Sequence, residues 1–549
     1  MNSREAFEFW MRSDYFDQET KKELEKISND PDEIEERFYK DLEFGTGGLR
    51  GIIGAGTNRM NIYTVRKASQ GLANYLLNNV KDAAARGVVI AYDSRHKSAE
   101  FAREAARVFA ANGIVSYLFD ELRPTPELSF AVRYLKAAAG VVVTASHNPK
   151  QYNGYKVYGE DGGQLPPEGS EAVLKEINAI TDITDIKPAD EKEALDKGLI
   201  RMIGKEVDDA YIESLKTLLV NPDEIKKAAD SMKIVYTPLH GSGNKPVRRI
   251  LAEAGFKNVL VVREQELPDP EFSTVKYPNP EEKDAFRLAI ELARKEDVDI
   301  IIGTDPDSDR VGVVVRNSAG EYAVLTGNQT GCLLMEYILS QKKAAGRLPE
   351  NGFVVKTIVT SELARQIADC YGVELIEVLT GFKFIGEKIK ELDEPGIKKF
   401  LFGFEESYGY LAGTFARDKD AVVASMLICE MAAYYRNRGM SLYEGLQEIF
   451  RKYGYFIEGI TSFTLEGKEG IEKIGAAMDA LRGMKSYDLD CCEIIAVRDY
   501  LTQRRTDLAD GSSRALDLPV SNVLYYELKD RAWFCIRPSG TEPKIKIYY

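Results

Sequence analysis

Three short apolar runs of this chain each pass directly into a polar loop, and this repeated pattern constrains the fold more than any other feature. The runs end near residues 143, 302 and 402 and are rich in β-branched or aromatic side chains, as expected of short buried strands. Each run lies in a separate stretch of alternating helices and strands. We therefore predict an internal structural repeat whose polar loops face one cleft.

The surrounding residues predict α/β units. From residue 62 onward we expect helices over 62–79 and 98–112 and strands over 88–92, 114–119, 233–237 and 259–262. Such alternation implies largely parallel sheets covered by helices. Residues 3–43 are predicted to form a helical packing arm without chemistry of its own, and the pattern of strands and helices changes after about residue 450.

The length of 549 residues suggests about three or four domains. A charged stretch at 181–197 and the change of pattern near 450 indicate boundaries. The predicted domains are 1–205 (the helical arm and α/β domain I), 206–320 (α/β domain II), 321–450 (α/β domain III) and 451–549 (α+β domain IV).

Charge and cysteine usage exclude several classes of function. The formal net charge of −14 argues against nucleic acid or an anionic membrane as a partner, so an anionic substrate would need a local group of Lys and Arg. The six cysteines have no C-x-x-C spacing and are predicted to be reduced thiols. With no apolar signal segment and no long apolar run, a cytoplasmic protein is expected.

The first polar loop follows the predicted strand 140–143. It carries Ser146, and we expect its hydroxyl to be exposed at the carboxyl end of the strand, where open α/β sheets bind ligands. An isolated serine is a poor nucleophile, and His147 and Lys156 supply a neighbouring base and a positive charge. Gly154 is expected to keep the following residues in a loop. The alternative is a turn that merely ends a strand.

The second polar loop contains three acidic residues at alternating positions, Asp305, Asp307 and Asp309, followed by Arg310. Three carboxylates this close repel one another and call for a cation, and hard oxygen ligands suit Mg²⁺. An EF-hand is excluded because no glycine follows Asp309 and no glutamate stands at position 12. The alternative is a solvated acidic turn.

The third polar loop and its neighbours are candidates for sugar recognition. Glu405 and Ser407 could hydrogen-bond vicinal sugar hydroxyls, and Lys419 follows closely. A further strand end carries Thr380, Gly381 and Lys383. Taken singly, each group could equally be packing.

Two other segments have the composition of phosphate sites. The glycines of 44–51 could turn backbone N–H groups toward an anion, with Arg50 adding a fork of donors; the alternative is a plain turn. Near the C-terminus, a turn combines an arginine for bidentate phosphate contact with small and hydroxylated residues, namely Arg537, Ser539, Gly540 and Thr541. There the alternative is an edge turn.

Taken together, these motifs resemble the α-D-phosphohexomutase superfamily over nearly the whole chain. The markers, in order, are Thr-Ala-Ser-His-Asn-Pro at 144–149, Asp-Pro-Asp-Ser-Asp-Arg at 305–310, Gly-Phe-Glu-Glu-Ser at 403–407 and Arg-Pro-Ser-Gly-Thr at 537–541. The N-terminal arm and the segments 44–50 and 380–383 resemble the bacterial branch related to phosphoglucomutases and phosphopentomutases.

The resemblance implies an α/β fold of three similar domains with mixed sheets around a central cleft, plus a C-terminal α+β domain of TATA-binding-protein-like fold that carries Arg537. It also implies Mg²⁺ and a resting enzyme phosphorylated on Ser146. Members of the superfamily usually continue past the last strand into a helix, whereas this sequence ends at Tyr549, which suggests a truncated chain.

The implied reaction interconverts α-D-glucose 1-phosphate and glucose 6-phosphate. Phospho-Ser146, held on Mg²⁺ together with the three aspartates, would pass its phosphoryl group to the sugar, and the glucose 1,6-bisphosphate formed would turn round and return its other phosphate. Lys156 and Arg310 would neutralise the phosphoryl oxygens, with Arg50 and His147 assisting near the serine. The group that takes the sugar hydroxyl proton stays open.

Several alternatives remain at this point. Mannose or pentose phosphates could replace glucose phosphates as substrates. From other classes, a Ser/metal phosphatase would release phosphate to water, and a non-catalytic sugar-phosphate-binding protein would keep only the phosphate clamp. A phosphosugar is the expected partner, glucose 1,6-bisphosphate the expected activator, and a monomer or dimer the expected assembly.

Overall fold

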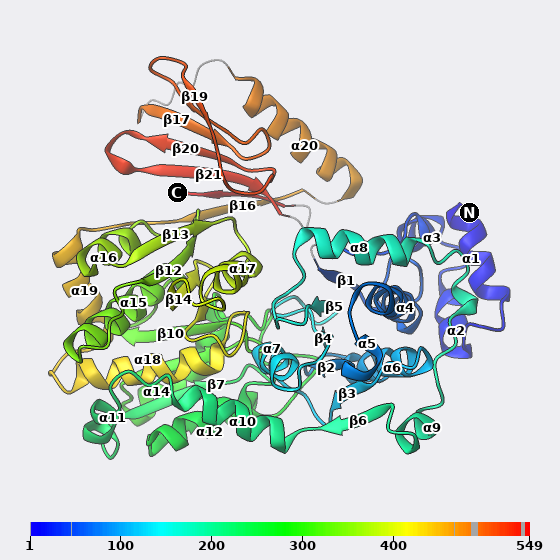
Figure 1. The fold of residues 1–549 in the computed structure, drawn as a ribbon, viewed down its shortest axis with the longest axis horizontal. Helices are drawn as coiled ribbons and strands as arrows, with labels where there is room; N and C mark the ends of the chain where they lie inside the picture. The colour runs from blue at the N-terminus through cyan, green and yellow to red at the C-terminus, as the bar shows by residue number, and fades with distance from the viewer. Residues whose placement is uncertain (1, 46, 466, 485–491, 540–543) are drawn as a thin grey trace.

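The computed structural model describes residues 2–45, 47–465, 467–484, 492–539 and 544–549. Within them, three α/β units with mixed sheets are followed by a C-terminal unit built on an antiparallel sheet (Figure 1). The predicted fold class is confirmed. Among the described residues, no helix is both long and apolar enough to cross a membrane.

The first unit has a sheet in the order β1-β5-β4-β2-β3-β6. Its strands are β1 Gly48–Ile52, β2 Val88–Tyr92, β3 Ser116–Phe119, β4 Ala139–Val143, β5 Tyr152–Tyr158 and β6 Ile200–Ile203. Strands β4, β2, β3 and β6 are parallel, and β5 and β1 close one edge in antiparallel fashion. Its helices are α4 Ile62–Asn79, α5 Ala83–Arg86, α6 Ser98–Ala111, α7 Thr125–Tyr134, α8 Pro167–Asn178 and α9 Glu191–Asp196, with a 3₁₀ turn at Ile183–Asp185.

Both faces of this sheet are apolar, because helices cover both. Val88 and Ile90 of β2 pack with α4 and α6, whereas the alternate residues Val89 and Ala91 pack with α7. This period of two is what a strand buried on both faces requires. It explains why β2 and β4 read as continuous apolar runs, and it confirms both predicted strands.

The second and third units repeat this design. The second sheet has the order β11-β10-β9-β7-β8, with β7 Lys233–Thr237, β8 Asn258–Val261, β9 Ile300–Thr304, β10 Val311–Arg316 and β11 Tyr322–Val324. The third has the order β13-β12-β14-β15, with β12 Gly352–Thr357, β13 Glu374–Val378, β14 Lys399–Glu405 and β15 Gly409–Leu411.

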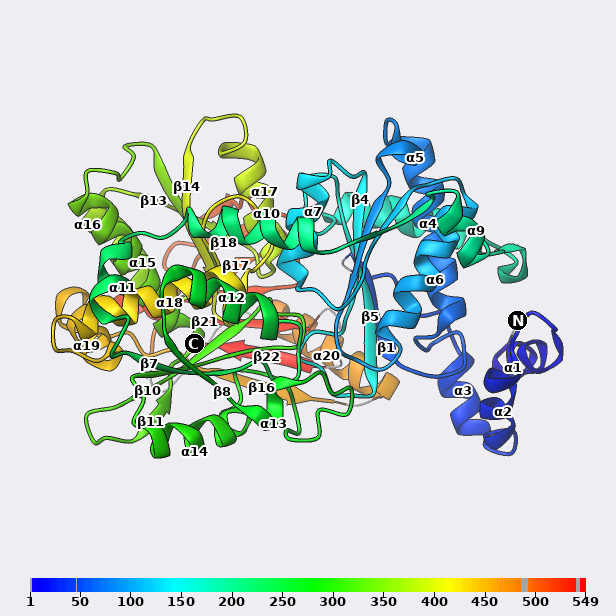
Figure 2. The ribbon, with the colours of Figure 1, turned by 90° about the horizontal axis from the view of Figure 1, so that it is seen from below.

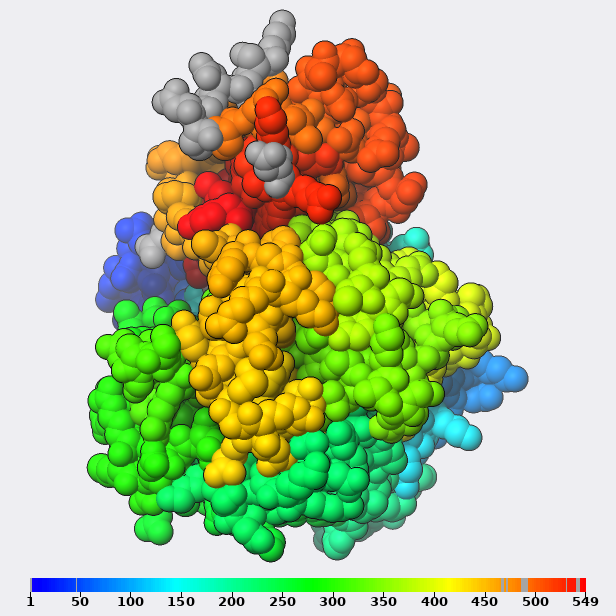
Figure 3. Space-filling view, turned by 90° about the vertical axis from the view of Figure 1, so that its left-hand side faces the viewer, coloured from blue at the N-terminus to red at the C-terminus, as the bar shows by residue number. Residues whose placement is uncertain are grey.

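The helices of these units join them through one core. Those of the second unit are α10 Lys205–Lys216, α11 Pro222–Ala228, α12 Asn244–Ala254, α13 Arg263–Glu266 and α14 Arg287–Glu296, with a 3₁₀ turn at Lys283–Phe286; those of the third are α15 Gly327–Ala344, α16 Leu363–Tyr371, α17 Phe382–Leu392, α18 Ala421–Arg436 and α19 Leu442–Tyr453. Helix α18 is buried almost throughout and packs against α11, α12 and α15, as expected of a helix that is apolar on all sides. In Figure 3, the gold segment that includes α19 lies between the second and third units.

The three polar loops occupy the same place in their units. Each connects a parallel strand to the antiparallel strand beside it: β4 to β5, β9 to β10 and β14 to β15. The strands end at 143, 304 and 405, and the internal repeat is therefore confirmed. The second and third strands run two or three residues further than predicted because Thr304 and Glu405 still pair with the neighbouring strand.

The N-terminal arm consists of the predicted helices, α1 Ser3–Arg12, α2 Gln18–Lys26 and α3 Pro31–Phe38. Trp10 stacks on Phe16 at 4.2 Å between ring centroids, and both rings contact Tyr63 of α4. This aromatic cluster fixes the arm to the outer side of the first unit, as Figure 2 shows.

The C-terminal unit has a sheet in the order β16-β22-β21-β20-β17-β18-β19. The elements are β16 Ile460–Thr464, α20 Gly467–Gly483, β17 Ile494–Asp499, β18 Arg504–Asp507, β19 Ser513–Ala515, β20 Leu524–Leu528, β21 Trp533–Pro538 and β22 Lys544–Tyr548, with a 3₁₀ turn at Lys529–Arg531. One face packs on α20 through Met478, and the other meets the third unit through Ile358 and Leu379.

Two local predictions are wrong. Gly48–Ile52 is a strand paired with β5 and not a glycine-rich anion loop, and Gly154 lies inside β5 and not in a loop. A Cβ on Gly48 would lie 2.2 Å from the Tyr155 carbonyl oxygen, so this glycine allows a close approach of two backbones.

The predicted domain boundaries stay predictions. Strand β11 at 322–324, just beyond the predicted boundary at 320, pairs with β10 of the second sheet. Helix α19 continues three residues past 450.

Candidate active site

Ser146 lies three residues beyond β4 in an unusual backbone conformation. Its φ is +51°, a left-handed value that residues other than glycine seldom adopt. Only 3% of the residue is exposed, so the predicted exposure of Ser146 is wrong; the aspartate loop of the second unit contacts its side chain. Its Oγ donates a hydrogen bond to Asp305 Oδ2 at 2.8 Å and lies 3.2 Å from His147 Nδ1.

The three aspartates of the second loop form a buried cluster. Asp305 and Asp307 are 0% exposed and Asp309 is 2% exposed, which rules out a solvated acidic turn. Carboxylate oxygens of the three residues lie within 4.8 Å of one another. Among the described residues, Oδ1 of Asp307 and Oδ1 of Asp309 are buried without a hydrogen-bond partner. Buried, unsatisfied, hard oxygen atoms at this spacing fit a metal site.

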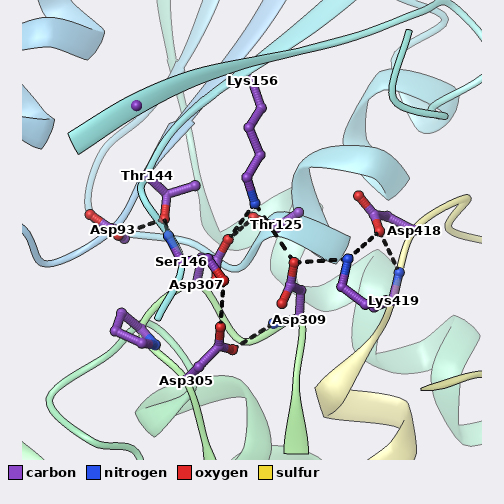
Figure 4. A network of polar contacts seen from close by, with 12 residues as sticks. Asp93, Thr125, Thr144, Ser146, Lys156, Asp305, Asp307, Asp309, Asp418 and Lys419 are labelled. Carbon is purple, nitrogen blue, oxygen red and sulfur yellow. Dashed lines mark hydrogen bonds and ion pairs between the residues drawn. The ribbon is translucent and has the colours of Figure 1, made fainter. Parts of the chain in front are cut away.

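Two lysines oppose the negative charge of the cluster. Lys156 Nζ lies 2.9 Å from Asp307 Oδ2 and 3.7 Å from Asp309 Oδ2, and Lys419 Nζ lies 3.2 Å from Asp309 Oδ2 and 3.1 Å from Asp418 Oδ1. In Figure 4, Lys156 enters from the first unit and Lys419 from the third, on two sides of the aspartates. The cluster is therefore completed by side chains from three units.

Burial and charge set the protonation of these groups. Burial and the neighbouring Asp307 and Asp309 raise the pKa of Asp305 well above its usual value. Burial also acts to raise the pKa of Asp307, but the charge of Lys156 and the hydrogen bonds with Asp305, Lys156 and Thr125 together outweigh it, so the pKa is lowered. For His147, burial and the charges of Arg310 and Arg50 lower the pKa well below its usual value, so the imidazole is neutral near pH 7.

Backbone hydrogen bonds hold the loops of different units together. The Val311 N–H donates to the Tyr408 carbonyl at 3.2 Å, and the Thr125 N–H at the start of α7 donates to the Asp307 carbonyl at 2.9 Å. Thr125 Oγ1 also donates to Asp307 Oδ2 at 3.0 Å. Together with the hydrogen bond from Ser146 to Asp305, these contacts bring all three loops to the aspartate cluster.

Each loop also contains one non-glycine residue with positive φ: Ser146 at +51°, Ser308 at +51° and Tyr408 at +64°. Such conformations concentrate at functional sites because the surroundings must hold them. No residue type in the sequence signals them, and they add an independent sign that these loops are functional.

The third loop lies beside the cluster. Glu405 is buried and its Oε1 accepts a hydrogen bond from Ser407 Oγ at 2.9 Å. Burial acts to lower the pKa of Lys419, but the carboxylates of Asp309, Asp418 and Glu405 outweigh it and the pKa is raised. The Glu405 carboxylate therefore lies close to Lys419. Arg310 forms an ion pair with Glu281 of the second unit. The structure therefore brings together the predicted residues Ser146, His147, Lys156, Arg310, Glu405, Ser407, Lys419 and the three aspartates.

Arg50 lies on β1, opposite Gly154 of β5, and contributes to the positive field at His147. Arg50 was predicted in a loop and instead lies on a strand, but its charge still acts on the loop that contains Ser146 and His147. The close pairing of β1 and β5 is what places it there.

Thr380, Gly381 and Lys383, the recognition candidates at a further strand end, lie at the start of α17. Gly381 has a φ of +125° and precedes α17, which begins at Phe382. The Thr380 hydroxyl is buried without a hydrogen-bond partner in the described part of the chain, and Lys383 Nζ lies 5.1 Å from the Phe384 ring centroid. No hydrogen bond or ion pair between described residues joins Lys383 to the Ser146 or aspartate loops.

Arg537 is at the end of β21 in the C-terminal unit, paired with Lys546 of β22. Its Nε is buried without a hydrogen-bond partner among the described residues, and its charge acts to lower the pKa of Glu406, which burial and Glu405 raise. The structure thus brings Arg537 to the third loop. Ser539 follows, whereas Gly540 and Thr541 lie outside the described residues.

Several residues of the site were not predicted. Asp93 and Arg95 support the Ser146 loop, Asp418 pairs with Lys419, and Glu281 pairs with Arg310. Asp93 and Arg95 directly follow the strand 88–92, so the pattern of a strand end with polar residues could have identified them. Glu281 lies in a segment with no such signal.

Comparisons with known proteins agree with this geometry. Sequence profiles described as phosphoglucomutase/phosphomannomutase, alpha/beta/alpha domains I, II and III match residues 41–184, 209–320 and 326–453. The phosphoglucomutase of Staphylococcus saprophyticus is 39% identical over 92% of this chain and 90% of its own length, and that of Staphylococcus haemolyticus is 40% identical over 94% and 91%.

Solved structures show the same fold. A putative phosphomannomutase from Thermus thermophilus has a TM-score of 0.67 at 24% identity, covering 93% of this chain and 95% of that one. The phosphoglucomutase pp63/parafusin from Paramecium has a TM-score of 0.66 at 17% identity, with coverage of 93% and 90%.

Proposed function

The chain belongs to the phosphoglucomutase/phosphomannomutase family of phosphosugar mutases, and we propose that it interconverts α-D-glucose 1-phosphate and glucose 6-phosphate through phospho-Ser146 and a glucose 1,6-bisphosphate intermediate. The observation that carries the proposal is the contact of Ser146 Oγ with the buried aspartate cluster at 2.8 Å. The choice of glucose phosphates follows the Staphylococcus relatives.

Asp305, Asp307 and Asp309 would hold Mg²⁺ together with the phosphorylated Ser146. The two buried carboxylate oxygens without partners among the described residues support this assignment, as does a donor set made only of oxygen. When bound, Mg²⁺ would neutralise charge on the oxygens of the transferring phosphoryl group.

In the first half-reaction, the bond between phosphorus and Ser146 Oγ breaks as phosphorus bonds to the free hydroxyl oxygen of the sugar monophosphate. That hydroxyl loses its proton, and the departing Ser146 Oγ takes one up, so no net proton is released. Lys156 and Arg310 would neutralise the negative charge on the equatorial oxygens of the phosphoryl group during transfer. Arg50 would add positive charge beside the nucleophile loop.

In the second half-reaction, Ser146 Oγ attacks the other phosphate of the reoriented bisphosphate and must lose its own proton. His147 Nδ1 at 3.2 Å can take it, because burial keeps the imidazole neutral. The leaving sugar oxygen takes up one proton to become the product hydroxyl, which balances the proton that Ser146 loses to His147.

The remaining residues would bind the sugar and its distant phosphate. Glu405, Ser407 and Lys419 are close enough to the aspartates to orient hydroxyl groups of the reacting sugar. Thr380, Gly381, Lys383, Arg537, Ser539, Gly540 and Thr541 would form the grip on the non-transferring phosphate and the ring. For Lys383, this division is supported by the lack of any hydrogen bond or ion pair, among the described residues, to the Ser146 or aspartate loops.

The burial of Ser146 disfavours a phosphatase, since its nucleophile must pass phosphate to water. An intact serine beside three aspartates is not needed in a purely binding protein. A coupled assay on glucose 1-phosphate, with free phosphate measured in parallel, tests all three. We expect glucose 6-phosphate with no stoichiometric phosphate release; release in step with substrate loss would indicate a phosphatase, and binding without turnover a regulator.

The sugar preference is tested by the same assay with mannose 1-phosphate and ribose 1-phosphate. Higher kcat/KM on either would assign the chain to the phosphomannomutase or phosphopentomutase alternative. A cytoplasmic location is part of the proposal; Cys332, Cys370, Cys429 and Cys535 are free thiols, which accords with a reducing compartment. A monomer or dimer stays a prediction.

A further inference from the structure

We propose that Asp93 and Arg95, directly after β2, are positioning residues that hold Ser146 in its left-handed conformation and so aim its Oγ at the aspartate cluster. The inference rests on the proposed role of Ser146 as the nucleophile. A non-glycine residue at φ +51° persists only when its surroundings determine the backbone, and Ser146 is held at both of its backbone polar groups.

The N–H of Ser146 is held through a threonine. It donates to Thr144 Oγ1 at 2.8 Å, and the Thr144 hydroxyl donates in turn to Asp93 Oδ2 at 2.7 Å. Figure 4 shows this line from Asp93 through Thr144 to Ser146. Because the threonine hydroxyl has one proton, its donation to Asp93 leaves a lone pair aimed at Ser146.

The carbonyl of Ser146 is held through the arginine. The Arg95 guanidinium donates to the Ser146 carbonyl, while its Nε lies 3.3 Å from Asp93 Oδ2. Asp93 Oδ1 accepts from the Arg95 N–H at 3.0 Å and from Ser98 Oγ at 2.7 Å. Both lines of support for Ser146 therefore converge on the Asp93 carboxylate.

Arg95 also fixes the rest of the loop. Its guanidinium donates to the carbonyls of Asn148, Pro149 and Tyr152, the last two at 2.9 and 3.2 Å. The residue is 3% exposed, and its planar fork can serve several carbonyls at once, which a lysine ammonium cannot do in the same geometry.

The second unit closes this arrangement. The buried Phe272 ring lies 5.0 Å from the Arg95 guanidinium carbon, in cation–π geometry. The unit that carries the aspartates thus contacts the side chain that orients the serine. Within the described part of the chain, no hydrogen bond or ion pair joins Asp93 or Arg95 to an aspartate of the cluster. The Arg95 charge does reach Asp307 and Asp305 through space, and a lysine at this position keeps that charge, so Arg95→Lys tests the hydrogen bonds to the Ser146 loop.

The chain offers a matched control at the other end of the same strand. Arg86 precedes β2 and donates to the carbonyls of Lys81, Lys136 and Ala137, with an ion pair to Glu160. Arg95→Lys and Arg86→Lys each remove a guanidinium that donates hydrogen bonds to several backbone carbonyls. Only Arg95 donates to carbonyls of the Ser146 loop.

The test measures kcat, KM and thermal stability of both variants with glucose 1-phosphate. We expect Arg95→Lys to lower kcat by on the order of 10²-fold with little change in KM, as for a slightly misplaced reacting group. Arg86→Lys should keep the kcat of the wild type, even if its Tm falls by as much as that of Arg95→Lys. Equal kcat for Arg95→Lys and wild type, or equal losses in both variants, would overturn the inference.

A second pair of variants decides the matter if Arg95→Lys does not fold. Thr144→Val removes the hydroxyl and keeps the shape, whereas Thr144→Ser keeps the hydroxyl. We expect the valine variant to lose kcat and the serine variant to recover most of it; equal kcat in the two would contradict the positioning role.

Phosphorylation of Ser146 separates this inference from the proposed function. The rate at which each dephosphorylated protein takes up a phosphoryl group from glucose 1,6-bisphosphate is followed by intact mass. If wild type takes up none, the proposed function fails. If wild type does and Arg95→Lys matches its rate, only the positioning role fails.

Discussion

The loop cluster around Ser146 and the Arg537 segment of the C-terminal unit are organised in opposite ways. Around Ser146, side chains from three units are buried, and backbone hydrogen bonds such as Val311 N–H to the Tyr408 carbonyl join the loops. Arg537 instead projects from a separate antiparallel sheet, and its buried Nε has no hydrogen-bond partner among the described residues.

The difference matches two demands of a mutase. Phosphoryl transfer needs preorganised charges that do not rearrange at the moment of reaction. A bisphosphate that must turn round needs a second grip that can release it, and a separate unit can move to do so. Under the proposed function, the first three units would carry out the chemistry, and Arg537 of the C-terminal unit would supply a releasable contact to the substrate.

The largest effect should come from Ser146→Ala. The variant lacks the oxygen that forms and breaks the bond to phosphorus, so we expect no detectable turnover of glucose 1-phosphate. The buried Ser116 of β3, whose hydroxyl donates to the Ala106 carbonyl, provides the matched control as Ser116→Ala, which should keep its turnover. Wild-type turnover in Ser146→Ala would remove the serine from the mechanism.

Asp307→Asn should follow. It removes one anionic oxygen from the cluster, and we expect kcat to fall by more than the roughly 10–100-fold typical of losing a residue that only supports a metal ligand. The Mg²⁺ concentration needed for half-maximal activity should rise. Asp297→Asn, at an exposed position of the same unit, should change neither. Full activity of wild type in excess chelator would exclude the metal.

Arg537→Ala tests the proposed substrate contact of the C-terminal unit. Loss of a charge-assisted contact costs about 1.5–3 kcal/mol, so we expect KM to rise by about 10–150-fold. More frequent escape of glucose 1,6-bisphosphate should also make the variant more dependent on added bisphosphate. Progress curves with and without that activator measure both, with the exposed Arg514→Ala as control. A variant equal to wild type in both would show that the clamp is wrongly assigned.

The smallest effect on turnover is expected from Glu430 in the α18 core that joins the second and third units. Burial raises the pKa of Glu430 to about 7, against partial compensation by the N–H groups of Val220 and Asn221. Because the pKa of Glu430 is higher in the folded protein than in the unfolded chain, where it is near 4.5, ionisation of this carboxyl opposes folding. The free energy of unfolding should therefore be highest below pH 4.5 and fall as the pH rises through 7.

Glu430→Gln removes this dependence. Relative to wild type, the variant should gain stability as pH rises from 4 to 8, by at most roughly 3 kcal/mol, with kcat unchanged. Denaturant unfolding at several pH values measures it, and the exposed Glu321→Gln is the control. A constant difference across this range would contradict the raised pKa.

The sequence allowed the strand-end loops to be predicted because β-branched runs pass abruptly into polar residues, and both features are local. The conformation of Ser146 was not predictable in this way. Its burial and positive φ depend on Asp93 and Arg95, about fifty residues earlier, and on Asp305 in another unit. The same limitation explains the error at Gly48–Ile52, whose strand depends on pairing with β5, about a hundred residues later.

The most direct test of the central claim is to identify the phosphorylated residue. Dephosphorylated protein is incubated with glucose 1,6-bisphosphate and Mg²⁺, and peptides are mapped by mass spectrometry alongside Ser146→Ala. We predict one phosphoryl group, on Ser146, and none in the variant. An active enzyme phosphorylated at another residue, or turning over without any phosphoenzyme, would contradict the account.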